Sequence, residues 1–369
     1  MQSNVKGTAA VQGTRISDDQ SWRLVIDALP VAALALDGDE IIVHHNPLMT
    51  DLFPRTRNGL ALSQVCRNPE LMEAVAGAGE TGGPAVVDLI DRVPVKRRIQ
   101  ATVSVLRRSG SETTLPKLLV TFRDLTEQER IEQMRVDFVA NASHELRTPL
   151  ASLLGYIETL QGAARDDPKA RDRFLNIMWN QAQRMTRLIE DLLSLSRIEM
   201  RQHLPPQDVV DLNEVAVNVT QSLELIAEAG RTSIVLKKLD GPARIRGERD
   251  EIVQVVQNLV QNAIKYGREG GEVRVTLTRE AGSKNGSSRL HVEVADEGQG
   301  IAPEHLPRLT ERFYRVSSAN SREKGGTGLG LAIVKNILLR HRGDLRIASD
   351  YGKGSRFTVI FDELPPESS

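Results

Sequence analysis

The sequence has little of what marks an extracellular or membrane-spanning chain. Its single cysteine, Cys66, excludes a disulfide framework within the chain and is typical of a reducing compartment. The longest apolar stretch, residues 25–36, is interrupted by Asp27 and Pro30 and falls short of the roughly 20 residues that span a bilayer. With 48 basic and 49 acidic residues, the chain also lacks the charge excess of proteins that bind nucleic acid directly.

A length of 369 residues, 40% of them hydrophobic, is enough for several domains with cores of their own. We expect a multidomain α+β protein with a disordered N-terminus at 1–16 and domains at 17–124, 125–204 and 205–369. In the first domain, short apolar runs alternate with turns rich in Gly, Pro and Asp. Residues 99–105 alternate apolar and polar side chains, as a half-buried strand does. A small α+β domain with an antiparallel sheet is therefore predicted.

The second domain reads as two long amphipathic helices, residues 125–160 and 174–195, joined by a turn at 162–168. Apolar residues recur every three, four or seven positions and form a seam along each helix. The seam residues are Ile131, Met134, Phe138, Ala142, Leu146, Leu153, Ile157 and Leu160, followed by Phe174, Ile177, Met185, Leu188, Leu192 and Leu195. Such a helical hairpin has more apolar surface than it can bury by itself, so we expect a homodimer in which two hairpins form a four-helix bundle.

The third domain alternates helical and strand patterns after Pro205 and Pro206. Helices are expected near 212–228, 250–266 and 329–340, and strands near 234–238, 273–279, 290–295, 345–349 and 356–361. This pattern predicts an α/β sandwich. Residues 303–326 mix charged and small side chains with little to bury, so we expect them to be mobile until a ligand orders them.

One histidine of the first long helix lies outside the apolar seam. At about 100° per residue, His144 is turned about 200° from both Ala142 and Leu146, which points it into solvent. A solvent-facing imidazole is mostly neutral at pH 7 and can attack an electrophilic phosphorus. Glu145, beside it, can orient the ring or accept its proton. Taken alone, an exposed histidine is more often an ordinary surface residue.

Two asparagines in the third domain suggest a magnesium site. Asn258 and Asn262 are four residues apart, on one face of a predicted helix that continues to Lys265 and Tyr266. Neutral amide oxygens suit Mg²⁺, which is usually held by few protein ligands together with phosphates and water. The alternative is a helix with ordinary polar outer residues.

Two glycine-rich segments follow this helix. In the first, Asp296 ends a predicted strand and precedes Gly298, Gly300 and Ile301, so a carboxylate at the strand end can accept a hydrogen bond from an exocyclic amine. In the second, the run Gly326, Thr327, Gly328, Leu329, Gly330 leads into a helix whose first N–H groups favour phosphate. The second run has neither P-loop nor dinucleotide-fold spacing, and the first is weak evidence alone.

Taken together, these segments resemble the sensor histidine kinases. The string His-Glu-Leu-Arg-Thr-Pro-Leu from His144 is similar to their phosphoacceptor box, and the asparagine and glycine segments resemble the Bergerat-type ATP-binding domain that these kinases share with type II topoisomerases, Hsp90-like chaperones and MutL-like proteins. The resemblance implies that ATP phosphorylates His144 and that the phosphoryl group passes to an aspartate of a response regulator. It also implies that Glu145 assists proton transfer and that Thr148 assists dephosphorylation of the regulator.

The same resemblance implies an ATP site with Mg²⁺ held by Asn262 and Asn258, and an adenine contact from Asp296. Phe313 matches an aromatic box of the kinase branch. The full set of implied ATP-site residues is Asn258, Asn262, Lys265, Tyr266, Asp296, Gly298, Gly300, Ile301, Phe313, Gly326, Thr327, Gly328, Leu329 and Gly330. Arg312 and Arg315 are further candidates for stabilising charge on the transferred group.

The first domain resembles a PAS sensor module, because Leu29-Pro30, Asp37-Gly38 and Asn46-Pro47 occur in the usual order and Asp124-Leu125-Thr126-Glu127 resembles the exit motif before a signalling helix. We expect no haem or flavin at His44, His45 or Cys66. Residues 130–200 most resemble phosphate-regulon sensor kinases, which suggests phosphate sensing. Because those kinases usually carry membrane segments that this sequence lacks, we expect either a cytoplasmic bacterial protein or the soluble portion of an inner-membrane protein attached through segments absent here.

Two other classes of function remain open at this point. A signalling scaffold would bind nucleotide without phosphorylating, or would act chiefly as a phosphatase of its partner. A mechanical ATPase of the topoisomerase or chaperone type would release free phosphate and would need no phosphoacceptor histidine. The helical hairpin that carries His144 favours the kinase over the mechanical ATPase.

Overall fold

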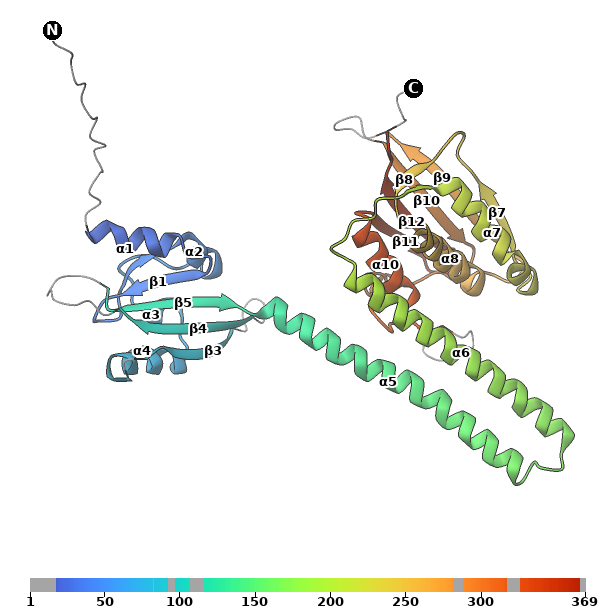
Figure 1. The fold of residues 1–369 in the computed structure, drawn as a ribbon, viewed down its shortest axis with the longest axis horizontal. Helices are drawn as coiled ribbons and strands as arrows, with labels where there is room; N and C mark the ends of the chain where they lie inside the picture. The colour runs from blue at the N-terminus through green and yellow to red at the C-terminus, as the bar shows by residue number, and fades with distance from the viewer. Residues whose placement is uncertain are drawn as a thin grey trace, which may run out of the picture. The chain divides into compact units, whose positions relative to one another are not determined.

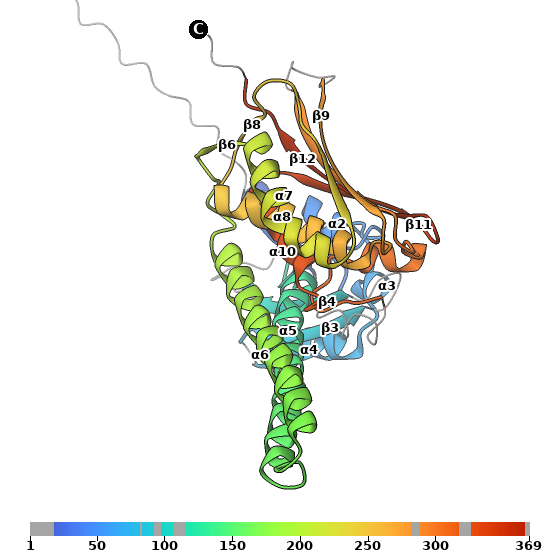
Figure 2. The same ribbon diagram turned by 90° about the vertical axis from the view of Figure 1, so that its right-hand side faces the viewer.

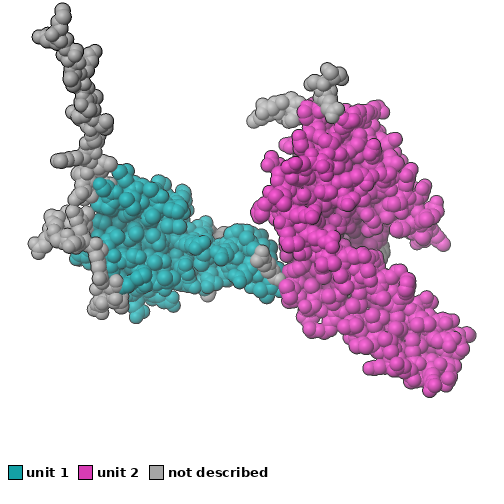
Figure 3. Space-filling view, viewed as in Figure 1, with its two compact units in different colours: residues 1–137 teal, residues 138–369 magenta. Residues whose placement is uncertain are grey.

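The chain divides into two compact units, residues 1–137 and 138–369, shown in Figure 3. The computed structural model describes residues 18–81, 83–91, 97–106, 116–281, 288–316 and 326–365. The N-terminal segment expected to be disordered, residues 1–16, lies outside them. Within the described residues, no helix combines the length and the apolar character needed to cross a membrane.

The first unit contains one five-stranded antiparallel sheet in the order β2-β1-β5-β4-β3. Its elements are α1 (Asp18–Asp27), β1 (Ala32–Leu36), β2 (Ile42–His45), α2 (Pro47–Leu52), α3 (Leu62–Val65), α4 (Pro69–Thr81), β3 (Ala85–Asp91), β4 (Arg97–Val105) and β5 (Leu118–Asp124). The short apolar runs predicted in this domain form these strands. The central strand β1 is buried along its whole length, because α1 packs on one face of the sheet while the main core fills the other.

A buried asparagine joins the elements of this unit. Asn46 is fully buried, and its Oδ1 accepts hydrogen bonds from the N–H groups of Ala33 and Met49, 3.0 and 3.1 Å away. Its Nδ2 donates to the carbonyl of Val31 at 2.8 Å and to that of Ile26 at 3.3 Å. A buried amide is stable only when both its oxygen and its nitrogen are satisfied. Asn46 therefore fixes the end of α1, the start of β1 and the N-terminus of α2 relative to one another.

Both predicted long helices form, and the second extends beyond the predicted 174–195 at both ends. Helix α5 runs from Thr126 to Gln161 and α6 from Pro168 to Met200, antiparallel to each other in Figures 1 and 2. Helix α6 begins sharply because Asp167 caps the N–H groups of Lys169 and Ala170 and a proline occupies the first turn. The hairpin thus presents one face of α5 alongside α6 from residue 138 onward.

The rest of the second unit is the predicted α/β sandwich. Its elements are β6 (Val209–Asp211), α7 (Leu212–Ala229), β7 (Ser233–Lys237), β8 (Arg244–Arg246), α8 (Arg249–Tyr266), β9 (Glu272–Glu280), β10 (Arg289–Asp296), the 3₁₀ helix η1 (Pro303–Arg308), α10 (Gly330–Arg340), β11 (Asp344–Asp350) and β12 (Gly354–Asp362). The sheet order is β11-β12-β10-β9-β7, with only the β7–β9 pair parallel among the described strands.

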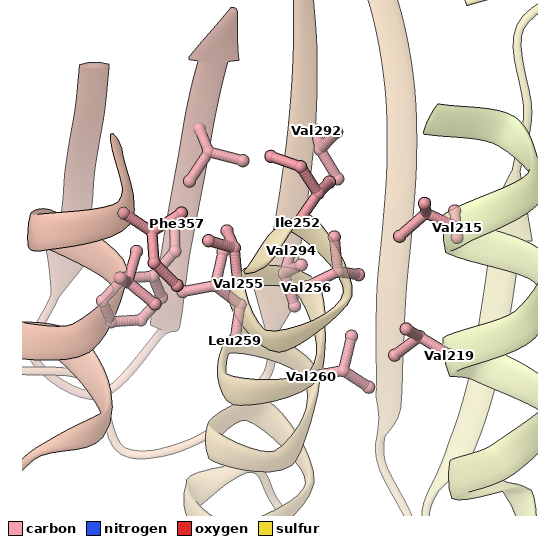
Figure 4. Packing of buried hydrophobic residues seen from close by; sticks show 14 of the residues in the cluster. Val215, Val219, Ile252, Val255, Val256, Leu259, Val260, Val292, Val294 and Phe357 are labelled. Carbon is pink, nitrogen blue, oxygen red and sulfur yellow. The ribbon is translucent and has the colours of Figure 1, made fainter. Parts of the chain in front are cut away.

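Helices α7, α8 and α10 cover one face of this sheet (Figure 2). The core lies between the layers, where Val215 and Val219 of α7 face the apolar side of α8 while Val292 and Val294 project from β10 (Figure 4). Burial alternates along β10, as expected for a sheet with one face packed and the other more open. This packing fixes the ends of α8 and β10, where the candidate site residues lie.

The expectation that residues 303–326 have little to bury was wrong for the part that the structure describes. Residues 303–308 form η1, and Leu309 and Phe313 pack against the core of the sandwich. Leu309 and Phe313 lie among charged residues, so the sequence pattern did not indicate that they are packed against a core. Residues 317–325 lie outside the described part of the chain, so for them mobility remains a prediction.

Candidate functional site

His144 lies on α5 with its side chain exposed, as its helical phase predicts. The hydroxyl of Thr148, one turn further on, donates a hydrogen bond to the His144 carbonyl at 3.2 Å. Pro149 follows inside the same helix and is buried. The imidazole therefore stands on a continuous helix and is open to a reactant from another part of the protein.

Glu145 takes part in contacts that the sequence did not predict. Its Oε2 accepts hydrogen bonds from Nη2 of Arg184 on α6, at 3.0 Å, and from Nη2 of Arg315, at 3.1 Å. Arg184 and Arg315 are 15% and 9% exposed, so both ion pairs are largely shielded from water. In this arrangement Glu145 is held by two arginines, and one of them comes from the sandwich domain.

The C-terminal half of α8 supplies amide and ammonium groups. Asn258 is half-buried, and its Nδ2 is enclosed without a hydrogen-bond partner. A Cβ on Gly330 would lie 3.2 Å from the Asn258 Oδ1, so α10 begins directly against this amide. Asn262 follows one turn later on α8 and is also half-buried. An enclosed amide with an unused donor is uncommon in a folded protein and points to a ligand.

Positive charge gathers at the end of the same helix. The Nζ of Lys265 lies 4.9 Å from the centre of the Tyr266 ring. Burial lowers the pKa of Lys265, and the nearby guanidinium groups of Arg315 and Arg187 lower it further. The Glu145 carboxylate, 3.1 Å from Nη2 of Arg315, offsets part of this charge. The cluster Lys265, Arg315 and Arg187 is therefore suited to bind phosphate.

The turn after β10 presents a carboxylate in an apolar setting. Asp296 is 9% exposed, and burial raises its pKa although the N–H groups of Gly298 and Ser355 donate to it. The N–H of Gly298 lies 2.8 Å from its Oδ1. A buried carboxylate with accepting capacity left can select a ligand that offers an N–H donor.

The geometry explains why this turn needs glycines. A Cβ on Gly298 would lie 2.2 Å from the Tyr266 carbonyl oxygen, so this turn touches the end of α8. Gly300 has φ of +69°, and a Cβ there would lie 2.1 Å from the Asp350 carbonyl oxygen. The N–H of the next residue, Ile301, donates to Ser349 Oγ at 2.8 Å. A side chain at Gly298 would push this turn away from α8, and one at Gly300 would push it away from Asp350.

The second glycine segment leads into an uncapped helix. Helix α10 begins at Gly330, and Leu329 before it provides no side-chain cap. Gly328 has φ of +74°, and its carbonyl accepts the N–H of Phe313 at 2.9 Å, which ties the aromatic box to this segment. Gly326 and Thr327 are half-buried beside it. An uncapped helix start leaves N–H groups free to bind an anion.

The sandwich domain packs against the hairpin through contacts that no motif indicated. Phe138 of α5 lies 5.9 Å from Phe313, ring centre to ring centre, and the guanidinium of Arg312 lies 5.0 Å above the Phe138 ring. Arg312 also forms an ion pair with Glu199 of α6. On α6, Leu188, Leu195 and Ile198 are buried in the same core as the sandwich helices. These partners are far apart in the sequence and belong to no local pattern.

The side-chain oxygens available as metal ligands fit the expected magnesium ion. Asn258 and Asn262 offer neutral oxygens on one helix face, and the described residues hold no cluster of three or more His, Cys, Asp or Glu side chains that could bind a metal by themselves. Magnesium held mainly by phosphates and water, with one or two protein oxygens, requires no such cluster. The enclosed Nδ2 of Asn258 is a donor, so it would serve a phosphate oxygen rather than the cation.

Comparison with known proteins agrees with this geometry. Residues 134–201 match the family described as "His Kinase A (phospho-acceptor) domain", and residues 247–365 match "Histidine kinase-, DNA gyrase B-, and HSP90-like ATPase". The chain is 42% identical over 243 residues to the phosphate regulon sensor protein PhoR of Pseudomonas aeruginosa, which covers 66% of this chain and 53% of PhoR.

A second relative matches over nearly the whole chain. The sensor-like histidine kinase SenX3 of Mycobacterium bovis is 30% identical over 361 residues, 96% of this chain and 83% of SenX3. The solved structure of the Acinetobacter baumannii histidine kinase AdeS is 27% identical and aligns with a TM-score of 0.46 over 59% of this chain and 97% of that one. By contrast, the chain spans 53% of the length of PhoR and 41% of that of the Bacillus subtilis kinase WalK. The match to SenX3 over most of both proteins, together with the two family domains, places the chain among the sensor histidine kinases.

Proposed function

We propose that this chain is a protein-histidine kinase that transfers the γ-phosphoryl group of ATP to His144 and then to an aspartate of a response regulator. The observation that carries the proposal is the contact between Arg315 of the sandwich domain and Glu145, which directly follows the exposed His144. It supports a path by which the phosphate end of the nucleotide site meets the acceptor helix.

In the proposed site, the Asp296 carboxylate accepts a hydrogen bond from the exocyclic amine of adenine. Lys265, Arg315 and the uncapped start of α10 bind the phosphates. Asn262 and Asn258 would hold Mg²⁺, which supplies charge neutralisation when bound. The remaining members of the site, Tyr266, Gly298, Gly300, Ile301, Phe313 and the run 326–330, shape the adenine pocket and the phosphate loop.

The chemical step forms one bond and breaks one bond. An imidazole nitrogen of His144 attacks the γ-phosphorus, the bond to the β–γ bridging oxygen breaks, and ADP leaves with that oxygen. The imidazole proton passes to Glu145 or to water. Because the transition state of phosphoryl transfer is loose, these residues contribute mainly positioning and charge stabilisation. Both arginine contacts use Oε2 of Glu145, so its Oε1 would accept the proton while the arginines hold the carboxylate in place.

We infer that the active form is a homodimer. The single hairpin leaves large apolar side chains exposed on both helices: Val139, Leu150, Leu154, Leu175, Trp179, Ile189 and Leu193. An exposed apolar stripe of this length along a helix pair is typical of a helix bundle that lacks its partner. A second copy of the hairpin would cover it.

The domain roles follow from the same proposal. Residues 17–124 would form a PAS-like sensor, 125–204 the signalling helix and phosphotransfer hairpin, and 205–369 the catalytic domain. The PAS assignment is supported by the five-stranded antiparallel sheet and the helices α2–α4 inserted between β2 and β3. The 42% identity to a phosphate regulon sensor supports phosphate limitation as the input, and Thr148 would assist dephosphorylation of the regulator.

Incubation of the purified chain with γ-labelled ATP and Mg²⁺ tests the proposal. Label should appear on the protein, survive alkali and be lost in acid, as a phosphoramidate requires. His144→Ala should abolish it, while His203→Ala, a matched change at another exposed histidine, should leave it unchanged. Label that persists in His144→Ala, or free phosphate without labelled protein, would refute the assignment and favour an ATPase.

A further inference from the structure

Three groups that the proposed function assigns to the phosphate side of the site, or that lie beside it, are bound by carboxylates of the hairpin. Thr327 Oγ1 donates to Asp191 Oδ2 at 2.6 Å, and Arg315 donates to Glu145 at 3.1 Å. Arg312 forms its ion pair with Glu199. The three carboxylates come from α5 and α6, so the hairpin supplies anions where a nucleotide would supply phosphates.

The Asp191 contact is the most informative of the three. The Thr327 hydroxyl that donates to Asp191 also accepts the Leu329 N–H at 3.3 Å, directly before the uncapped start of α10. The Thr327 hydroxyl therefore links the Asp191 carboxylate to the N-terminal end of α10, where anions are favoured. Burial also raises the pKa of Asp191, which indicates that this carboxylate has lost much of its hydration in forming the contact.

We propose that Asp191 competes with the phosphates of the nucleotide for Thr327 and the start of α10, so that the docked arrangement excludes phosphate until the hairpin releases this segment. This inference rests on the proposed function, because it concerns the regulation of the same site. A hydroxyl has one proton to donate and cannot serve a carboxylate and a phosphate oxygen together. Two anions at the same helix start also repel each other.

By thermodynamic linkage, docking of the hairpin lowers the affinity for nucleotide by the same factor by which bound nucleotide weakens docking. A signal that favours the docked arrangement lowers nucleotide affinity, and a bound nucleotide favours release of α6. Asp191 contacts Thr327 of the phosphate loop, whereas the contacts described for His144 and Glu145 do not involve it. Its substitution therefore separates the regulatory contact from phosphoryl transfer.

The test compares full-length Asp191→Asn with wild type by calorimetric titration of adenosine, ADP and ATP in the presence of Mg²⁺. Asparagine keeps the shape and an acceptor but removes the charge. We expect ADP and ATP to bind about fivefold or more tightly, within the usual range of coupling between sites. Adenosine, which has no phosphates, should bind as it does to wild type. Glu190→Gln, which removes the neighbouring exposed charge, should leave all three affinities unchanged.

Each outcome separates the inference from the function on which it rests. Equal or weaker ADP binding by Asp191→Asn, or equal tightening by Glu190→Gln, overturns competition at Asp191 while leaving the nucleotide site intact. If no variant binds ADP, including Asp191→Ala, the proposed nucleotide site itself fails and the inference fails with it. Tightening in both Asp191→Asn and Asp191→Ala supports the competition, since a substitution that merely loosened the fold would not strengthen binding.

Discussion

A buried ion pair joins α10 to α8 within the catalytic domain, and its arginine also binds a carbonyl beyond the end of the hairpin, so its removal has a calculable cost. Arg340, at the end of α10, is 6% exposed, and its Nη1 donates to Oε1 of Glu251 in the first turn of α8. Its Nε donates to the Leu204 carbonyl at 3.0 Å, just beyond the end of α6. The other oxygen of Glu251, Oε2, is buried without a hydrogen-bond partner and lies 3.7 Å from the Nδ1 of His341.

The change to make is Arg340→Leu. It leaves the 12%-exposed Glu251 carboxylate without its guanidinium partner, and such a loss usually costs about 3–5 kcal/mol. Losing the bond to the Leu204 carbonyl adds about 1 kcal/mol. The double variant Arg340→Leu with Glu251→Leu removes both charges, so we expect it to recover most of that loss, because well-packed apolar replacements of a buried pair are often neutral.

Equilibrium unfolding in urea measures these differences in the free energy of unfolding. The unfolding transition of the second unit is followed separately from that of the first. Glu269→Gln, at an exposed ion pair with Arg231, serves as control and should change stability by no more than about 0.5 kcal/mol. A cost below about 1 kcal/mol for Arg340→Leu would refute the reasoning. So would a double variant as unstable as the single one, since the cost would then come from lost packing rather than from an unpaired charge.

Two further predictions concern protonation and the glycine turn. Burial lowers the pKa of His341, so as pH falls the unfolded state takes up a proton before the folded state does. The free energy of unfolding should therefore be at its full value above the ordinary histidine pKa of about 6.5 and should decline below it. In urea titrations between pH 7.5 and 5.5, the stability of His341→Gln should decline less steeply than that of wild type or of His203→Gln, a change at an exposed histidine. Gly300→Ala should weaken ADP binding by about tenfold or more, because the new Cβ would meet the Asp350 carbonyl and displace Asp296. Gly270 has a similar positive φ but open space around it, so Gly270→Ala should leave the ADP affinity unchanged in the same titration. Equal effects of the two changes would show that backbone strain alone is responsible.

Periodicity in the sequence was enough to predict most regular elements. The long helices follow from a spacing near 3.6, and strands such as β4 and β10 follow from a spacing of 2, because each has one face packed against a core. The apolar run that forms β1 shows no such period, since that strand is buried along its whole length. The short elements were missed for a physical reason: β6 and β8 have three residues each, too few to show a period, and their pairing is held by contacts 33–37 residues apart along the chain. Helices α1 to α4 were also not predicted; α2 and α3, with six and four residues, are too short to show a helical period.

Some residues of the candidate site could be predicted from the sequence and others could not. The asparagine, aspartate and glycine segments were predicted because each is a short string of characteristic residues, although Gly298 and Gly300 approach Tyr266 and Asp350, which are distant in the sequence. Arg184, Asp191 and the pair Arg340–Glu251 were missed because each acts on a partner between 39 and 136 residues away. For Arg184 and Asp191 one sequence signal was available, because they directly precede Met185 and Leu192 of the apolar seam, where an unpaired charge would be costly.

The positions of the apolar residues on α6 bear on whether competition at Asp191 can operate within a dimer. Leu188 and Leu195, seven residues apart, are buried against the catalytic domain, whereas Ile189 and Leu193 remain 45% and 52% exposed. Because consecutive residues on a helix differ by about 100°, these pairs form two separate stripes. A second hairpin can cover the exposed stripe without disturbing the one that packs on the catalytic domain. Docking and dimerisation therefore use different faces of α6, and release of Asp191 by nucleotide would not require the dimer to dissociate.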